Sequence, residues 1–113
     1  MKELKFKTVT AIEVPIELVD DKVETFATIV KEMTELYAKK NHDYGNSFDE
    51  CCDKIGSGYA TGRIYDKINR IINLTNNEKE AQVNESIEDT LLDLANYSVM
   101  YLSYLRRKKN GNS

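Results

Sequence analysis

The sequence predicts a mainly α-helical protein: a small helix bundle with a short β element at its N-terminus, assembled into an oligomer. Three observations support this prediction. Several long segments repeat apolar residues every three or four positions, which is the spacing of one helix face. One Pro and five Gly in 113 residues leave room for long regular elements. The first segment, 4–16, instead alternates in the manner of a strand.

A length of 113 residues favours a single domain, with an assembly segment over 1–18 and a helical core over 20–108. The net charge of −3 is too small to draw the chain to nucleic acid, so we expect no duplex partner. We find no run of about 18 apolar residues and no apolar core behind the first three residues. We therefore expect neither a membrane span nor a secretory signal, and a cytoplasmic location.

The segment from Leu4 to Ile16 is rich in β-branched residues, and Pro15 is suited to an edge position. A lone strand would leave its backbone donors and acceptors unpaired. The segment either bends into a short hairpin or pairs with the same strand of another subunit. We slightly favour pairing between subunits, which would make the N-terminus an assembly device.

The next segment predicts a helix that begins at Asp20 or Asp21. Either carboxylate can cap the helix, and Glu24 is placed to complete a capping box after Asp21. Glu32 and Glu35 lie three residues apart, where they either bind a ligand or, more commonly, belong to an exposed face. The apolar stripe of this helix consists of Val23, Phe26, Val30, Met33 and Tyr37.

We expect this helix to end in a loop over 39–47, because the Asn, Asp and Gly residues there are typical of turns. Loops that collect polar groups often carry binding. We predict that Lys40, Asp43 and Tyr44 contribute to a ligand site. His42, the only histidine, is more often a solvated loop residue than a ligand.

A short helix should follow, opened by a capping box of Ser47 and Glu50. The run Gly56-Ser57-Gly58 interrupts it, and its flexible backbone could approach a ligand closely. Cys51 and Cys52 are neighbours, which rarely bridge each other, so we expect reduced thiols with at least one buried. The residues expected to face inward are Phe48, Cys52 and Ile55.

A third helix is predicted over about Thr61 to Leu74. Arg63, Lys67 and Arg70, here called the basic row, recur at four and three residues on one face, with Asp66 beside them. The basic row either balances the acidic residues of the last helix or holds phosphate oxygens, for which Arg is well shaped. The residues expected to face the core are Tyr59, Ile64, Ile68, Ile71 and Ile72.

The last predicted helix, Asn84 to Arg107, is the longest. Its first turn is acidic and its end is basic, which is the charge order that the helix dipole favours. Its C-terminal half is apolar nearly all round, which indicates burial on more than one side and hence at least a dimer. Its main apolar face consists of Ile87, Leu91, Leu94, Ser98, Tyr101, Leu102 and Leu105.

The opposite face of the last helix carries Glu85, Asp89, Asp93 and Asn96. At about 100° per residue, these four positions fall within about 80° of one another. Carboxylates at the edge of an apolar region need a cation, a metal or hydrogen-bond donors. One interpretation is a solvated acidic row beside a dimer interface. The other is a ligand site in which Asn96 contacts the ligand and the three carboxylates bind Mg²⁺.

Three blocks of the chain resemble the nucleotide modification associated domain 1 family: KKNHDYGNSF from Lys39, YDKINRI from Tyr65 and ESIEDTLLDLANY from Glu85. The resemblance covers roughly residues 23 to 105. Members are small proteins common in phages and prophages, so the resemblance implies a nucleotide-linked role and, for a phage-encoded chain, the host cytoplasm. The chain is more distantly similar to MazG-type all-α nucleotide pyrophosphatases, in which facing helices hold Mg²⁺ with Glu and Asp.

The resemblance leaves three hypotheses open. The chain could hydrolyse a phosphoanhydride with Mg²⁺ on Glu85, Asp89 and Asp93, although the sequence predicts no catalytic residue by itself. It could instead sequester a nucleotide immune signal, of cyclic or ADP-ribose type, as an anti-defence protein, with Tyr44 or Tyr59 stacked on a base. In the third hypothesis, the charged rows only pair with each other in an oligomer. We rank nucleotide binding first.

Overall fold

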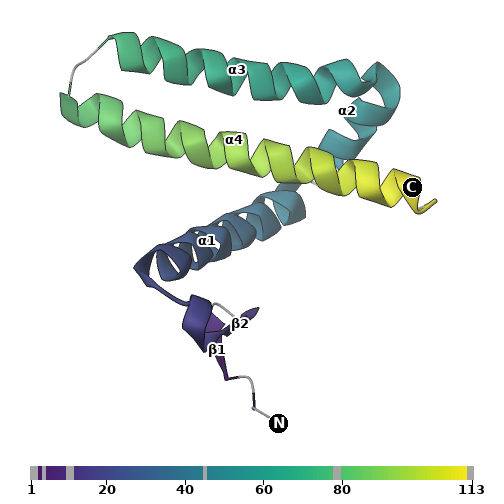
Figure 1. Ribbon diagram of the computed structural model, residues 1–113. Helices are drawn as coiled ribbons and strands as arrows, with labels where there is room; N and C mark the ends of the chain where they lie inside the picture. Colours follow the sequence, from purple (N-terminus) through teal and green to yellow (C-terminus); the bar gives the residue numbers. More distant parts are fainter. Residues whose placement is uncertain (1–2, 4, 10–11, 45, 78–79, 112–113) are drawn as a thin grey trace. The chain divides into compact units, whose positions relative to one another are not determined.

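The computed structural model describes residues 3, 5–9, 12–44, 46–77 and 80–111, without the side chains of 7–9, 43–44 and 80–85. The chain forms two compact units, Met1–Asp43 and Tyr44–Ser113, each described here by itself. The elements are β1 (Phe6–Val9), β2 (Ile12–Pro15), a 3-10 turn (Ile16–Leu18), α1 (Asp21–Tyr44), α2 (Ser47–Ile55), α3 (Ser57–Asn76) and α4 (Glu80–Lys109) (Figure 1). This confirms a mainly α fold with three longer helices and one short one. Among the described helices, none combines the length and apolar character that a membrane span needs.

In the N-terminal unit, β1 and β2 form an antiparallel hairpin in which Phe6 pairs with Pro15 and Val9 with Ile12. The two halves of the alternating segment therefore supply each other's backbone partners. Our preference for pairing between subunits was wrong, and the hairpin alternative is the one found. A further bond from the Ile16 amide to the Lys5 carbonyl, 2.7 Å long, closes the hairpin toward α1.

Helix α1 begins as predicted, because the carboxylate of Asp20 accepts a 2.9 Å hydrogen bond from the Val23 amide and caps the first turn. Its end was predicted wrongly. The helix continues to Tyr44 through most of the expected loop, because the segment Asp21–Tyr44 contains neither Gly nor Pro. The Asn and Asp residues of the expected loop each cost a helix only about 0.7 kcal/mol. In the predicted apolar stripe, Val23, Val30 and Met33 are half-buried, whereas Phe26 is 73% exposed and Tyr37 39% exposed.

The core of the C-terminal unit forms where α2 meets α3 and α4. Phe48, Cys52 and Ala60 are buried there, and both cysteines are free, as expected. Ile55 was predicted to be buried but is 66% exposed, because it is the last residue of α2. The partly buried residues packed on this core are Tyr59, Tyr97, Met100, Tyr101 and Tyr104.

The ends of α2 also differ from the predicted ones. Ser47 lies inside the helix and Asn46 occupies the cap position without a side-chain bond, so the predicted capping box does not form. Gly56 has φ +97°, a conformation that only glycine adopts readily, and it lets α3 start at Ser57, four residues earlier than predicted.

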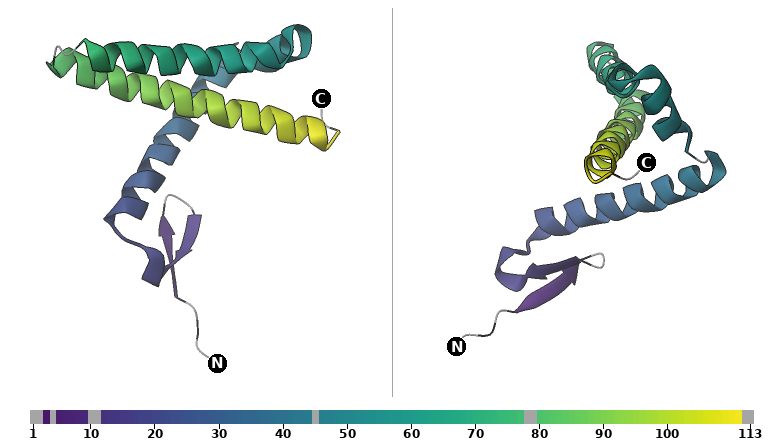
Figure 2. Two further views of the ribbon diagram at one scale, coloured as in Figure 1. Left: turned by 45° about the horizontal axis from the view of Figure 1, so that its top comes forward. Right: turned by 90° about the vertical axis from the view of Figure 1, so that its right-hand side faces the viewer.

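Helices α3 and α4 run side by side in opposite directions (Figures 1 and 2). The connection between them is shorter than predicted, because α3 extends to Asn76 rather than Leu74 and α4 begins at Glu80 rather than Asn84. The face of α4 that meets its neighbours carries Thr90, which is 2% exposed, Tyr97 and Tyr104.

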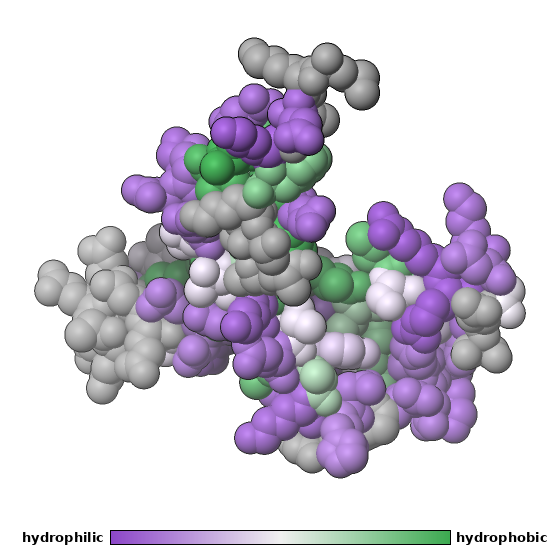
Figure 3. Space-filling model, turned by 90° about the horizontal axis from the view of Figure 1, so that it is seen from below, coloured by the Kyte–Doolittle hydropathy of each residue, from purple (hydrophilic) through white to green (hydrophobic). Residues whose placement is uncertain are grey.

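The apolar face predicted for α4 is therefore only partly used within the chain. Leu91, Leu102 and Leu105 of this face are 46–47% exposed within the chain. Ile68 and Ile72 of α3 were expected inside and are 41% and 50% exposed. The physical reason is that aromatic and charged groups of α2 and α3 select the more polar face of α4. Apolar side chains consequently reach the surface among hydrophilic ones (Figure 3).

Candidate functional site

The basic row of α3 lies along its contact with α4. The Arg63 guanidinium carbon lies 5.6 Å from the ring centre of Tyr59 and 5.8 Å from that of Tyr97. Its interaction with the Tyr59 hydroxyl is the largest cause that raises the pKa of Arg63, followed by the charge interaction with Tyr97. Lys67 Nζ lies 3.4 Å from a carboxylate oxygen of Asp93 and 6.0 Å from the Tyr97 ring. The row thus meets aromatic faces and one carboxylate of α4.

Arg70 is positioned by a buried threonine. Arg70 Nε donates a 3.2 Å hydrogen bond to the hydroxyl oxygen of Thr90, and the same hydroxyl donates a 2.6 Å bond to the Ser86 carbonyl. Thr90 is therefore satisfied on both sides while it fixes the Arg70 side chain. Arg70 remains exposed, and within the described part of the chain its Nη groups make no hydrogen bond. These donors are available to an anion.

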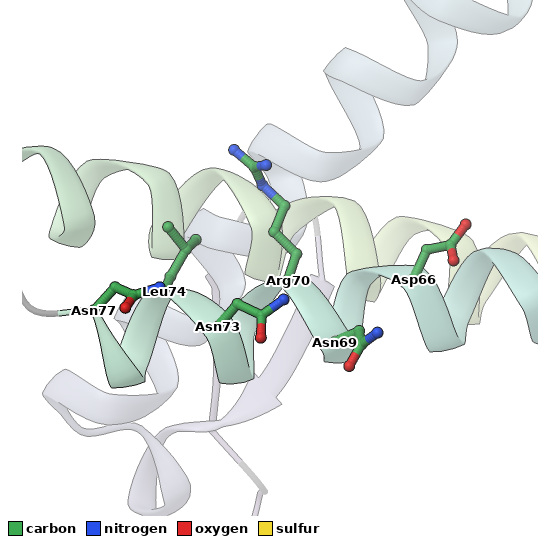
Figure 4. A pocket seen from close by; sticks show the side chains of 6 residues that line it. All are labelled: Asp66, Asn69, Arg70, Asn73, Leu74 and Asn77. Atoms are coloured by element: carbon green, nitrogen blue, oxygen red, sulfur yellow. The ribbon is translucent and has the colours of Figure 1, made fainter.

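Beside Arg70 lies a depression of about 310 Å³, here called the α3 depression. The residues that line it come from α3 and from Asn77, which follows the last residue of α3 (Figure 4), so three amides, a carboxylate and a guanidinium lie along one side of this helix. This volume falls at the lower end of the range of about 300–1,000 Å³ that is usual for small-molecule sites. The lining residues are Asp66, Asn69, Arg70, Asn73, Leu74 and Asn77.

The residues predicted to bind Mg²⁺ are only partly described. Asp89 is exposed, Asp93 is half-buried and paired with Lys67, and the side chain of Glu85 lies outside the described residues. In the described part of the chain, no three or more His, Cys, Asp or Glu side chains are grouped so that they could hold a metal ion. The structure does bring the basic and acidic rows together at Lys67 and Asp93.

The other predicted ligand-binding residues belong to both units of the chain. Lys40 is exposed on α1 in the N-terminal unit, while the side chains of Asp43 and Tyr44 lie outside the described residues. Tyr59 is half-buried, with its ring 5.7 Å from that of Phe48. Asn96 is half-buried on α4. The weaker candidates Glu32, Glu35 and His42 are exposed.

Thr90, Tyr97 and the amides of the α3 depression were not predicted from the sequence. The amides had a detectable signal, because Asn69, Asn73 and Asn77 recur every four residues and so share one face of a helix. Thr90 and Tyr97 gave no comparable signal, since their roles depend on which face of α4 meets α3.

A comparison with protein-family models matches residues 40–105 to nucleotide modification associated domain 1. The chain belongs to this family. The resemblance found in the sequence is thereby confirmed, and the matched span contains α2, α3, the α3 depression and most of α4. No curated protein and no solved structure matches the chain.

In this member of the nucleotide modification associated domain 1 family, a second charged cluster fastens α2 to the end of α4, and two of its residues, Arg107 and Lys108, lie just beyond the matched span. Both Nη atoms of Arg107 donate to the two carboxylate oxygens of Asp49. The Tyr104 hydroxyl donates a 2.5 Å bond to Asp53, and Lys108 lies 3.0 Å from the same carboxylate. These contacts span more than 50 residues of sequence, so the cluster acts as a clamp between helices.

The clamp shifts the pKa values of Asp53 and Tyr104 and of the neighbouring Cys52. The hydrogen bond from Tyr104, and then that from Lys108, lowers the pKa of Asp53. Burial, and then the charge of Asp49, raises the pKa of the Cys52 thiol, which therefore stays protonated and unreactive. The bond to Asp53 raises the pKa of Tyr104 to about 12.

This clamp predicts a pH-dependent loss of stability in alkali. The folded-state pKa of Tyr104 is about 12, above the value of about 10 for a free tyrosine, so its stabilising bond is complete below pH 10 and lost as pH rises through 12. The pH titration of the absorbance at 295 nm for the wild type, minus that for Tyr104→Phe, isolates the ionisation of Tyr104. We expect the midpoint of this difference curve near pH 12. When both proteins also carry Asp53→Asn, we expect the midpoint near pH 10. A wild-type midpoint near 10, with the helices intact by circular dichroism, would contradict the bond.

Proposed function

We propose that this chain binds a nucleotide along α3, with Arg70 at the centre of the site. The observation that carries the proposal is the place of Arg70: an exposed guanidinium, held by buried Thr90, at the edge of an amide-lined depression. Membership of a family associated with nucleotide modification supports a nucleotide as the ligand.

The chemistry of the site suits the parts of a nucleotide. One guanidinium group can bind two phosphate oxygens at once, so Arg70 and Arg63 would hold the phosphates. The side-chain amides of Asn69 and Asn73 offer both donors and acceptors to a base edge. The carboxylate of Asp66 accepts hydrogen bonds from ribose hydroxyls. Leu74 contributes the apolar surface.

The bound nucleotide would either be hydrolysed or be held intact. In the first, Mg²⁺ bound by Glu85, Asp89 and Asp93 would assist hydrolysis of a phosphoanhydride; the observation in favour is that Asp93 lies beside Lys67 of the basic row. In the second, the nucleotide is only held, as expected of a phage-type protein that sequesters an immune signal. Binding itself is common to both.

The test is a thermal-shift screen of the full chain with nucleotides, cyclic dinucleotides and ADP-ribose, with and without Mg²⁺. Calorimetry then measures the Kd of each hit for wild type, Arg70→Gln and Lys54→Gln. We expect Arg70→Gln to raise the Kd about tenfold or more, because a hydrogen bond to a charged group is worth about 1.5–3 kcal/mol. Lys54→Gln removes the same charge from an exposed position of α2 and should leave the Kd unchanged.

Mass spectrometry of the recovered ligand separates the two fates. Cleavage that requires Mg²⁺ supports hydrolysis, and intact ligand supports sequestration. No stabilisation by any ligand of the panel, or equal Kd values for Arg70→Gln and wild type, would overturn the proposed site.

A further inference from the structure

One side of the α3–α4 pair exposes large aliphatic side chains. Leu91, Leu102 and Leu105 of α4 are 46–47% exposed, and Ile68 and Ile72 of α3 are 41% and 50% exposed. On α4 the exposed leucines belong to a stripe with heptad-like spacing of three and four residues. This stripe, here called the α4 stripe, consists of Leu91, Leu94, Ser98, Leu102 and Leu105.

The two sets of residues share one side of the helix pair. Each residue turns a helix by about 100° around its axis. Around α4, the centre of the α4 stripe is rotated by about 80° from buried Thr90. Around α3, Ile68 and Ile72 are rotated on average by about 100° from buried Ala60, in the same rotational sense. Because the two helices run antiparallel, equal rotational senses place both sets on the same side. The contacts of Arg63 and Arg70 lie toward the other side.

The size of this apolar face is comparable to that of the largest apolar patch on a typical monomer. The stretch from Leu91 to Leu105 is about 21 Å long at 1.5 Å per residue, and two packed helices are about 20 Å wide. The projected area is thus on the order of 400 Å². The largest contiguous apolar patch on a typical monomer covers about 300–600 Å² and is often functional.

We propose that a second copy of this chain covers the apolar face, with the two α4 helices antiparallel and Ser98 on the two-fold axis. In this arrangement Leu91 of one copy lies opposite Leu105 of the partner subunit, and Leu94 lies opposite the partner's Leu102. Each leucine of the stripe meets another leucine, and the smallest residue meets itself at the centre. Self-complementarity of this kind is what a two-fold interface requires.

Charge complementarity selects the antiparallel direction. Glu88 flanks the start of the α4 stripe, whereas Arg106 and Lys109 flank its end, and all three side chains are exposed. Antiparallel packing brings Glu88 of one copy within about one turn of the partner's Arg106 and the partner's Lys109. Parallel packing would instead place the basic ends together, where like charges repel.

The first test is the molar mass of the full chain by light scattering after size exclusion. We expect the wild type to run at about twice its 13.0 kDa chain mass. Leu102→Glu should raise the dimer Kd at least about 100-fold, because the charge disrupts both symmetric Leu94–Leu102 contacts. Leu102 is half-exposed within the chain, so circular dichroism of the variant should stay unchanged. A monomeric wild type at 100 µM would overturn the proposal.

The second test is disulfide cross-linking at the axis. With helix axes about 8–10 Å apart and Cα atoms about 2.3 Å from each axis, the two Ser98 Cα atoms lie about 3.4–5.4 Å apart, which overlaps the disulfide range of about 4.4–6.8 Å. We expect Ser98→Cys to cross-link on mild oxidation, whereas Ser103→Cys, exposed on the opposite side of α4, and the wild type do not. Equal cross-linking of the two variants, or none at Ser98→Cys in a proven dimer, would overturn the antiparallel geometry.

Discussion

Phe48→Ala is expected to lower the free energy of unfolding of the C-terminal unit by about 3–5 kcal/mol, the usual cost of deleting a buried phenylalanine. Phe48 is 8% exposed, and its ring lies 5.7 Å from that of Tyr59 and 6.2 Å from that of Tyr97. Its loss opens a cavity where α2, α3 and α4 meet. A unit of this size is stable by only about 4–10 kcal/mol, so most of its stability should disappear.

Urea titration followed by helical circular dichroism measures this effect. Ile55→Ala is the matched control, because Ile55 lies on the same helix but is 66% exposed. We expect it to change the free energy of unfolding by at most about 0.5 kcal/mol. Equal losses in the two variants would show that α2 is not anchored through Phe48.

The inward face of α2 illustrates what periodicity can predict. Phe48 and Cys52 lie four residues apart and are both buried, as their spacing predicts. Ile55 continues the same pattern but falls at the last position of the helix, next to Gly56, where no neighbouring helix covers it. The pattern therefore identifies the buried face, while the helix end decides where burial stops.

Helix α4 shows the limit of the same reasoning. Its sequence contains two usable faces, an aliphatic one that includes Leu91 and Leu102 and a more polar one that includes Thr90 and Tyr97. Hydrophobicity alone selects the aliphatic face as the core. Within the chain, however, the aromatic cluster around Phe48 and the basic row of α3 engage the polar one. A second copy on the aliphatic face would reconcile the two, because both faces would then be buried.

The candidate site, too, could be predicted from the sequence only in part. The spacing of Arg63, Lys67 and Arg70 predicts one row on one helix, and the structure has that row. The α3 depression and the bond from Arg70 to Thr90 depend on distances between helices, which local sequence does not encode. A site built on one helix is thus partly visible in the sequence, while the residues that position it are not.

Ala60→Leu is the second large effect we expect. Ala60 is 1% exposed at the point where α3 packs on α2 and α4, so three additional carbon atoms have no space and overpacking should cost about 1–3 kcal/mol. Because Arg63 lies only one turn further along α3, displacement of α3 also shifts the basic row against Tyr97 and Thr90. Nucleotide affinity should therefore fall together with stability.

Thr61→Leu is the control for Ala60→Leu. It introduces the same leucine at the neighbouring position of α3, which is exposed, so it tests whether the effect comes from packing at Ala60 and not from the leucine itself. Thr61 is exposed, and its hydroxyl bonds only to carbonyls of its own helix, so the same leucine there should change the free energy of unfolding by at most about 0.5 kcal/mol. Its nucleotide affinity should equal that of the wild type. If Ala60→Leu were as stable as Thr61→Leu, the helices would not be in contact at Ala60. If Ala60→Leu lost stability but kept full nucleotide affinity, the basic row would bind the nucleotide independently of its contact with α4. Thr90 would then not be needed to position Arg70 for binding.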